Sequence, residues 1–258
     1  MKIKGTCEDK FIEVKELFTD LHKSEREVGS SYAVYKDGKP VVDIWGGYCD
    51  KDLKKEWSRD TLATVWSTTK GVAAITLAHA YENDLFDYEE KVAKYWPEFG
   101  CNGKEDITVG MLLSHQAGIC GSSANKVEDY YNQKIMADEL AKMAPLWEPG
   151  TASGYHSMTY GWLTSELMLR ITGKTLGRYF REEIADSNEI DFYIGLPDDE
   201  EFRVAEMIPF PKESNESKSH PNEAQKASGQ GPNLLKHQNT REWRTAEIPS
   251  ANGQGCAS

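Results

Sequence analysis

The pattern of apolar and polar positions predicts one helix and one β-hairpin in residues 1–60. Residues 10–23 carry apolar side chains at helical spacing among charged ones, which is typical of an amphipathic helix. The period then changes, and the apolar runs 31–35 and 40–45 flank a turn containing Asp37 and Gly38. Because Asp-Gly tolerates the positive φ angles of a two-residue turn, we expect these runs to pair as antiparallel strands.

Helical periodicity then predominates, and it predicts a mainly helical subdomain over residues 61–210. Residues 68–82 are apolar on nearly every side, which favours a helix buried between layers. Further helices are expected at residues 107–114, 135–143, 158–171 and 175–184, with Gly173 ending the third of them, and short strands near 190–195 and 203–208.

The last part of the chain is polar. Residues 211–240 are rich in Ser, Asn, Gln, Lys and Pro and have little to bury, so we expect a long mobile loop there. Residues 241–258 are interpreted as a truncated tail. The order of elements predicts an α+β fold in a single domain over residues 1–258, with an antiparallel sheet layer and an all-helical subdomain.

Composition narrows the possible partners. The net charge of −12, without a cluster of basic residues, argues against binding to nucleic acid. The N-terminus has no apolar signal region, and no apolar run is long enough to span a membrane, so we expect a soluble cytoplasmic protein, with a mitochondrial location left open. The five cysteines are an odd number without a C-x-x-C pair, which favours free thiols and no metal site: Cys7, Cys49, Cys101, Cys120 and Cys256.

One pair of residues has the spacing of an activated nucleophile. Ser67 and Lys70 lie one helical turn apart at the start of the apolar segment, so the amine and the hydroxyl can point at the same place. The positive end of the helix would favour both a developing oxyanion and a neutral lysine. The alternative is structural, with Ser67 as a helix cap and Lys70 as a solvated charge.

The spacing alone is weak, because Ser123 and Lys126 also match Ser-x-x-Lys. This second copy lies in a polar segment without a long apolar helix behind it, and we interpret it as a chance match. It nevertheless provides an internal comparison for the pair formed by Ser67 and Lys70.

Several segments together resemble a known superfamily, the serine β-lactamases and penicillin-binding-protein-like proteins, and in particular its class C-related and esterase-like branch and the β-lactamase-domain proteins of animals. The resemblance covers nearly the whole chain. The segments that carry it are residues 41–47 (VVDIWGG), 64–71 (TVWSTTKG), 107–118 (ITVGMLLSHQAG), 147–151 (WEPGT) and 154–161 (GYHSMTYG).

The resemblance implies a β-lactamase/transpeptidase-like fold and a catalytic set. It assigns Ser67 as the acylated nucleophile, Lys70 as its base and Tyr155 as the residue that passes a proton to the leaving group. Ser157 stands where the family often has asparagine, which favours esters over lactams, and Ser157 and His156 become candidates for substrate contacts. No metal and no organic cofactor is implied.

The resemblance also predicts a third motif, such as Lys-Thr-Gly, on a strand after Tyr155, and we find none in this sequence. The letters Trp-Gly-Gly at residues 45–47 precede Ser67 and do not take that place. By the same resemblance a new helix should begin within residues 251–258. We therefore expect that the C-terminal sheet strands are missing.

Two functions remain open from the sequence. The first is a serine hydrolase that acts on a small-molecule ester or amide through an acyl-enzyme at Ser67. The second is a catalytically impaired short form that serves as a non-enzymatic interaction or assembly protein. Unpaired strand edges next to the missing strands would also favour self-association.

Overall fold

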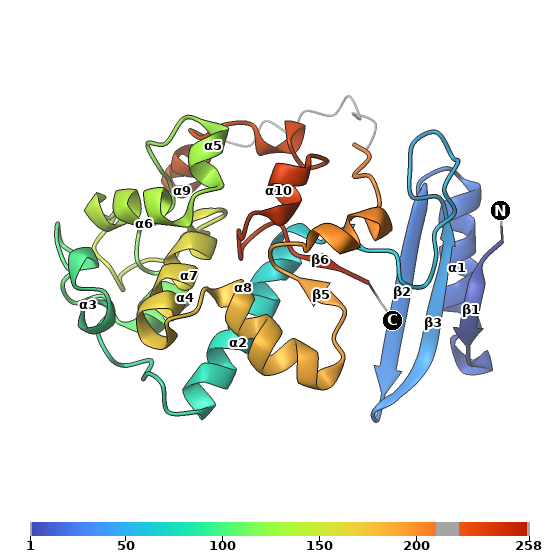
Figure 1. Ribbon diagram of the computed structural model, residues 1–258, viewed down its shortest axis with the longest axis horizontal. Coiled ribbons are helices and arrows are strands. Elements are labelled where there is room, and N and C mark those ends of the chain that lie inside the picture. The colour runs from blue at the N-terminus through green and yellow to red at the C-terminus, as the bar shows by residue number, and fades with distance from the viewer. Residues whose placement is uncertain (1, 210–221, 257–258) are drawn as a thin grey trace. The chain divides into compact units, whose positions relative to one another are not determined.

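The computed structural model describes residues 2–209 and 222–256 (Figure 1). Contacts within the chain divide it into two compact units. The first contains Met1–Thr64, Pro197–Lys212 and Gln254–Ser258, and the second contains Val65–Leu196 and Glu213–Gly253. The chain passes from the first unit to the second between Thr64 and Val65, and residues 197–209 group with the sheet unit rather than with the helices.

The first unit contains a three-stranded antiparallel sheet in the order β1–β3–β2. Its strands are β1 (Lys4–Cys7), β2 (Gly29–Lys36) and β3 (Lys39–Gly47). The predicted hairpin is confirmed, and its turn has φ angles of 51° at Asp37 and 74° at Gly38, which explains why a glycine is used there. Strand β1 was not predicted, because four residues that include a glycine show no alternation.

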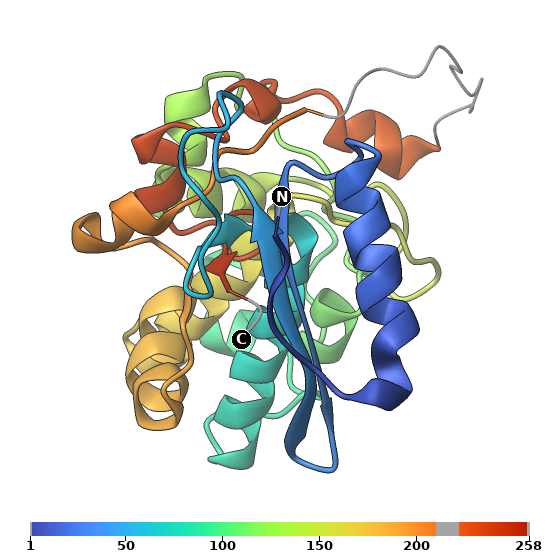
Figure 2. The same cartoon turned by 90° about the vertical axis from the view of Figure 1, so that its right-hand side faces the viewer.

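The predicted first helix is also confirmed as α1 (Ile12–Lys23), which lies along the sheet (Figure 2). Its Phe18 shares a buried cluster with Val42 and Ile44 of β3, and burying such side chains stabilises the contact by roughly 1.5–3 kcal/mol each. The apolar pattern of α1 therefore indicates its buried face only in part, because Phe18 is buried whereas Leu17 is 63% exposed.

The tail of the chain returns to the first unit as a strand. β6 (Gln254–Gly255) pairs antiparallel with β4 (Ala63–Thr64), and the buried Gln254 amide donates a hydrogen bond of 2.8 Å to Thr64 Oγ1. The expectation of a new helix within residues 251–258 is therefore wrong for residues 254–255. This pairing joins residues almost 200 positions apart, so no local pattern could reveal it.

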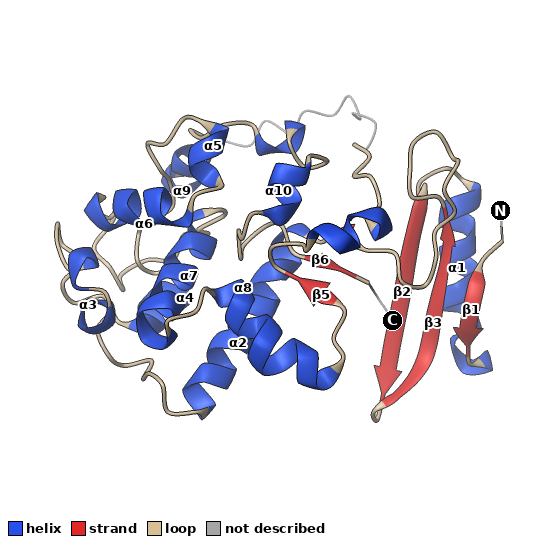
Figure 3. Cartoon of the chain, in the orientation of Figure 1, coloured by secondary structure: helices blue, strands red, loops and turns tan. Residues whose placement is uncertain are grey.

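The second unit is mainly helical (Figure 3). It contains α2 (Thr69–Glu82), α3 (Val92–Tyr95), α4 (Val109–Leu113), α5 (Val127–Tyr130), α6 (Gln133–Lys142), α7 (Thr159–Thr172), α8 (Leu176–Tyr179), α9 (Glu223–Ser228), α10 (Arg241–Thr245) and the short strand β5 (Phe192–Tyr193). Helix α8 continues as a π-helical segment over Phe180–Ala185. The four helices expected at 107–184 are present, and Gly173 ends α7 with φ 74°.

The most deeply buried helix of this unit is α7. The residues from Thr159 to Met168 are all buried, and α7 contacts α2, α3, α4, α6 and α8. Helix α2 instead buries one face, while Ile75 on another face is 60% exposed. The prediction of burial on nearly every side was wrong because α2 is rich in alanine, which is common both inside and outside proteins.

The loop expected at residues 211–240 is corrected where the structure describes it. Residues 210–221 lie outside the described residues, but α9 begins directly after Asn222. Asn222 and Gln225 form a reciprocal capping box, and Ala224 is buried. The polar composition was misleading here because these polar side chains satisfy the free backbone groups of a helix terminus.

Short strands were expected near residues 190–195 and 203–208. The first corresponds to β5, whereas the second contributes a single bridge between Val204 and Leu62. Helix α10, within the segment interpreted as a truncated tail, places the fully buried Trp243 in the core of the helical unit. Within the described residues 241–256, this segment is therefore a packed part of the fold.

Candidate active site

Ser67 lies in the 3₁₀ turn Trp66–Thr68, immediately before α2. Ser67 is exposed. The preceding Trp66 has a φ angle of 46°, which is uncommon for a bulky residue. The Trp66 ring packs against the buried Trp243 with ring centroids 5.3 Å apart. This packing stabilises a strained turn that presents the Ser67 hydroxyl at the protein surface.

Lys70 lies one turn further along and is held by three oxygen atoms. Its Nζ is 2.7 Å from the carbonyl oxygen of Ser157, 2.8 Å from that of Ser250 and 3.2 Å from Ser67 Oγ. The residue is only 9% exposed, so the amine has little access to water. The two carbonyls can take two N–H groups, which leaves the third position of the nitrogen directed at the Ser67 hydroxyl.

Burial also alters the charge of this amine. Desolvation lowers the pKa of Lys70, and a hydrogen bond with Tyr155 and the charge of Tyr155 offset this only in part. A neutral amine has two N–H donors and one lone pair, which matches two carbonyls and one hydroxyl. The lowered pKa makes the neutral form of Lys70 easier to reach than that of a solvated lysine, while its role as a base stays a prediction.

Tyr155 reaches the same hydroxyl from the segment between α6 and α7. Its hydroxyl is 2.8 Å from Ser67 Oγ, and its ring centroid is 4.8 Å from Lys70 Nζ. Burial alone would raise the pKa of Tyr155, but hydrogen bonds with Ser67 and Lys70 and the positive charge of Lys70 outweigh it, so this pKa is lowered. Ser67, Lys70 and Tyr155 thus lie within hydrogen-bonding reach of one another, while their catalytic role stays a prediction.

Ser157 and His156, the two predicted substrate contacts, differ in their burial. Ser157 is half-buried and gives its carbonyl oxygen to Lys70, and a contact between its hydroxyl and a substrate stays a prediction. His156 is fully buried, with Nδ1 donating to the Gly154 carbonyl at 2.6 Å and Nε2 accepting the Ile119 N–H at 3.0 Å. The prediction that His156 contacts substrate is therefore corrected, because both ring nitrogens are used by the backbone and no part of the ring is accessible.

The burial of His156 predicts a pH dependence of stability. Burial lowers its pKa to about 4, although the Gly154 carbonyl opposes this, whereas a histidine in an unfolded chain titrates near 6.5. Between these values the unfolded chain binds more protons than the folded one, so the free energy of unfolding should fall as pH drops from about 6.5 to 4, by roughly 3 kcal/mol. Urea denaturation of wild type and His156→Gln across this range measures it.

Other groups titrate in the same range, so the decisive quantity is the difference between the two proteins. In His156→Gln the free energy of unfolding should fall much less between pH 6.5 and 4 than in the wild type. Glutamine keeps an acceptor for the Ile119 N–H but has no titrating ring. Parallel pH profiles for the two proteins would contradict the assignment of His156 as a buried neutral histidine.

Residues 246–253, which hold Lys70 through the Ser250 carbonyl, were not predicted as part of the site. The Asn252 side chain donates to the carbonyls of Trp243 and Ala246, both at 2.6 Å, and accepts the Ile248 N–H at 3.0 Å. These bonds close a compact turn that presents the Ser250 carbonyl to Lys70. The Asn-Gly pair at residues 252–253 is the turn signal that could have indicated it.

The same turn requires a glycine in the neighbouring helix. A Cβ at Gly161 of α7 would lie 2.9 Å from the backbone nitrogens of Pro249 and Ser250, closer than real contacts allow. The Ser250 hydroxyl also donates to the Met158 carbonyl at 2.8 Å, so the turn is fastened to the start of α7. The presence of a glycine at position 161, in the first turn of α7, is explained by this close approach.

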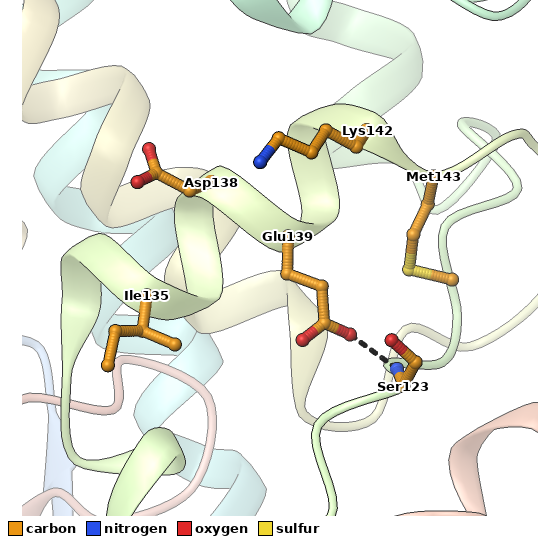
Figure 4. A pocket seen from close by; sticks show the side chains of 6 residues that line it. All are labelled: Ser123, Ile135, Asp138, Glu139, Lys142 and Met143. Carbon is orange, nitrogen blue, oxygen red and sulfur yellow. Dashed lines mark hydrogen bonds between the residues drawn. The ribbon is translucent and has the colours of Figure 1, made fainter.

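The second Ser-x-x-Lys match has a different environment. The backbone N–H of Ser123 donates to the Glu139 carboxylate at the rim of a surface pocket (Figure 4). The same carboxylate oxygen accepts from the Ser122 hydroxyl at 2.7 Å and the Ala124 N–H at 2.9 Å. Lys126 is exposed, in contrast to Lys70, so this segment is organised as a structural loop around Glu139.

Two properties of the described residues concern the predicted partners, a metal ion and a membrane. In the part of the chain that the structure describes, no group of three or more His, Cys, Asp or Glu side chains is arranged to hold a metal ion. Across residues 2–209 and 222–256, the helices are too short or too polar to cross a membrane.

The chain resembles several known proteins. It matches the family model described as Beta-lactamase over residues 14–258. Over 209 residues it is 38% identical to the esterase/beta-lactamase LipL of Mycobacterium tuberculosis, a match that covers 80% of this chain and 48% of LipL. The chain thus spans about half the length of this relative.

Solved structures agree with this match. A family VIII carboxylesterase has a TM-score of 0.90 and 40% identity, covering 99% of this chain and 69% of that one. A penicillin-binding protein homologue from Caulobacter crescentus has a TM-score of 0.90 and 36% identity, covering 99% and 68%. The predicted β-lactamase/transpeptidase-like α+β fold is confirmed, and the chain belongs to the beta-lactamase family, within the serine β-lactamase and penicillin-binding-protein-like superfamily.

Proposed function

We propose that this chain is a serine hydrolase that cleaves a small-molecule ester, or a reactive amide, through an acyl-enzyme on Ser67. The observation that carries the proposal is the arrangement of two proton-transfer groups, Lys70 Nζ at 3.2 Å and Tyr155 Oη at 2.8 Å, around one exposed hydroxyl. A serine hydroxyl becomes a useful nucleophile only when a neighbouring base removes its proton.

Acylation would proceed as follows. Neutral Lys70 takes the proton of Ser67 while Oγ attacks the substrate carbonyl carbon, and the carbonyl oxygen becomes an oxyanion. The backbone N–H of Ser67 and the positive N-terminal end of α2 stabilise that oxyanion. Tyr155 donates its proton to the leaving alcohol or amine, the bond to the leaving group breaks, and Tyr155 regains a proton from Lys70.

Deacylation uses the same groups in reverse. Neutral Lys70 takes a proton from water while the water oxygen attacks the acyl carbon, and Ser67 Oγ then leaves with that proton returned from Lys70. No change in oxidation state occurs, and the net reaction consumes one water. The carbonyls of Ser157 and Ser250 hold Lys70 in place throughout.

Esters are the preferred substrate class. The hydroxyl of Ser157 stands where the superfamily often has asparagine, and a hydroxyl cannot replace both the donor and the acceptor of an amide group. The relatives support this preference, since one is named an esterase/beta-lactamase and another a family VIII carboxylesterase.

The test is a comparison of p-nitrophenyl esters of short acyl chains with nitrocefin on the whole chain. We expect ester hydrolysis with an initial burst, faster than nitrocefin turnover, and an acyl group on the peptide that contains Ser67 when the reaction is quenched and analysed by mass spectrometry. Absence of both the burst and the labelled peptide would contradict the proposal and favour the non-enzymatic interaction role.

A further inference from the structure

The segment that carries Tyr155 is attached to His115 on both sides of the tyrosine. The Gly154 N–H donates to the His115 carbonyl oxygen at 3.0 Å, and the His156 N–H donates to His115 Nδ1 at 3.2 Å. One residue therefore accepts hydrogen bonds from the two peptide groups that flank Tyr155, one through its backbone and one through its side chain.

The His115 ring also packs against the tyrosine itself. The centroids of the His115 and Tyr155 rings are 5.1 Å apart, and the His115 ring also contacts Tyr160 of α7, with centroids 5.0 Å apart. Tyr160 is only 5% exposed, so this second contact is part of the core. The exposed Tyr155 thus has a firm contact on one of its sides, although half of its own surface is open.

The hydrogen bond to Nδ1 requires a neutral ring. A nitrogen that accepts an N–H carries no proton, so the single ring proton is on Nε2. Burial and the nearby charge of Lys70 lower the pKa of His115, which keeps the ring neutral near pH 7. The acceptor is therefore always present under ordinary conditions.

His115 also has an unusual backbone, with a φ angle of 64°. Left-handed backbone is tolerated best by asparagine, aspartate and glycine, so histidine costs some stability here. If the side chain at position 115 made no specific contact, asparagine, aspartate or glycine would give a more stable backbone there. The contacts with the Tyr155 segment supply a reason for the histidine.

From these contacts we infer that His115 is a positioning residue for Tyr155, which places the Tyr155 hydroxyl at Ser67 Oγ through the bond from the His156 N–H to Nδ1. The inference rests on the proposed function and deepens it. His115 itself touches no reacting atom, so it acts on proton transfer through Tyr155 alone. Displacing a reacting group by about 1 Å can reduce a rate on the order of 100-fold.

Substitution of His115 by asparagine or glutamine distinguishes the hydrogen bond to Nδ1 from simple packing of the ring against Tyr155. In His115→Asn the side-chain oxygen occupies the place of Nδ1 and can accept the His156 N–H, whereas in His115→Gln the oxygen reaches the place of Nε2 and cannot. We expect His115→Asn to retain kcat for ester hydrolysis within about threefold and His115→Gln to lose roughly 10-fold to 100-fold, with KM changed less than about threefold in both.

Stability is measured on the same samples, because asparagine suits a left-handed backbone better than glutamine. Urea denaturation identifies the fraction folded in each assay, and kcat is compared per folded molecule. His115→Phe, which keeps a ring against Tyr155 and has no acceptor, should behave like His115→Gln. A structural role for the ring alone predicts the opposite order, with His115→Phe more active than His115→Asn.

The matched control is His79 of α2, another half-buried histidine in contact with a tyrosine. Its Nδ1 lies 3.1 Å from Tyr179 Oη, and the two ring centroids are 5.8 Å apart. His79→Asn and His79→Gln should have equal kcat. Equal kcat in the Asn and Gln variants of His115 would overturn the inference while ester hydrolysis by the wild type still supports the proposed function, and an inactive wild type overturns both.

Discussion

Ser67→Ala is expected to lower ester hydrolysis at least about 10⁴-fold and to abolish labelling by a fluorophosphonate probe, because removal of an attacking hydroxyl leaves only binding and oxyanion stabilisation. The fold should be unaffected, since Ser67 is exposed and its hydroxyl holds no other part of the backbone in place. The measurement is hydrolysis of a p-nitrophenyl ester together with the mass of the probe-treated protein.

The chain contains its own control for this substitution. Ser123 has the same Ser-x-x-Lys spacing, but Lys126 is exposed and Ser123 is bound through its backbone to Glu139. Ser123→Ala should therefore retain labelling and hydrolysis. If Ser67→Ala were labelled as rapidly as the wild type, Ser67 would not be the nucleophile, and a residual rate carried by Ser123 would be revealed by the double substitution.

Lys70→Met has the second largest expected effect, a loss of roughly 10²- to 10⁴-fold in kcat/KM, which is the usual contribution of a general base. Methionine has a similar shape but no amine, so packing along α2 is largely kept while the proton acceptor is lost. Steady-state kinetics across pH measure the effect, with unfolding in urea as the check on the fold.

The pH dependence of kcat/KM shows whether Lys70 acts in its unprotonated form, as a general base. A base must be unprotonated to act, so kcat/KM of the wild type should rise with pH through the pKa of Lys70, which burial lowers from its ordinary value. In Lys70→Met that limb should be absent. Lys126→Ala is the matched control and should leave both the rate and the pH profile unchanged. A rising limb of the same midpoint in Lys70→Met would assign it to another group.

Ser67→Ala and Lys70→Met also differ in their expected effect on stability, because only one of them leaves buried polar groups unpaired. Removing the amine of Lys70 leaves the carbonyls of Ser157 and Ser250 without their shared donor inside the protein, at a cost of about 1–3 kcal/mol for each buried group that stays unpaired. Ser67→Ala leaves no such buried group. Lys70→Met is therefore expected to be the less stable of the two.

Local chemistry made part of this protein predictable. The spacing of Ser67 and Lys70 places both on one side of a helix, whatever surrounds that helix. The Asp37-Gly38 turn and the glycine that ends α7 are determined by which φ angles a residue tolerates. The periodicity of residues 12–23 likewise indicates part of the buried face of α1, because a helix repeats every 3.6 residues.

Other features depend on segments that are distant along the chain. The Ser250 carbonyl reaches Lys70 across 180 residues, and the 246–253 turn can approach α7 only because residue 161 is a glycine. Strand β6 pairs with β4, which precedes it by almost 200 residues. His156 looked like a possible substrate contact until packing buried it. A backbone carbonyl or a buried ring has no signature in the sequence, because its environment is formed only when remote segments meet. The apolar segment that follows Lys70 could therefore favour this pair over Ser123 and Lys126, but the burial of Lys70 against remote carbonyls and the exposure of Lys126 are decided by tertiary packing.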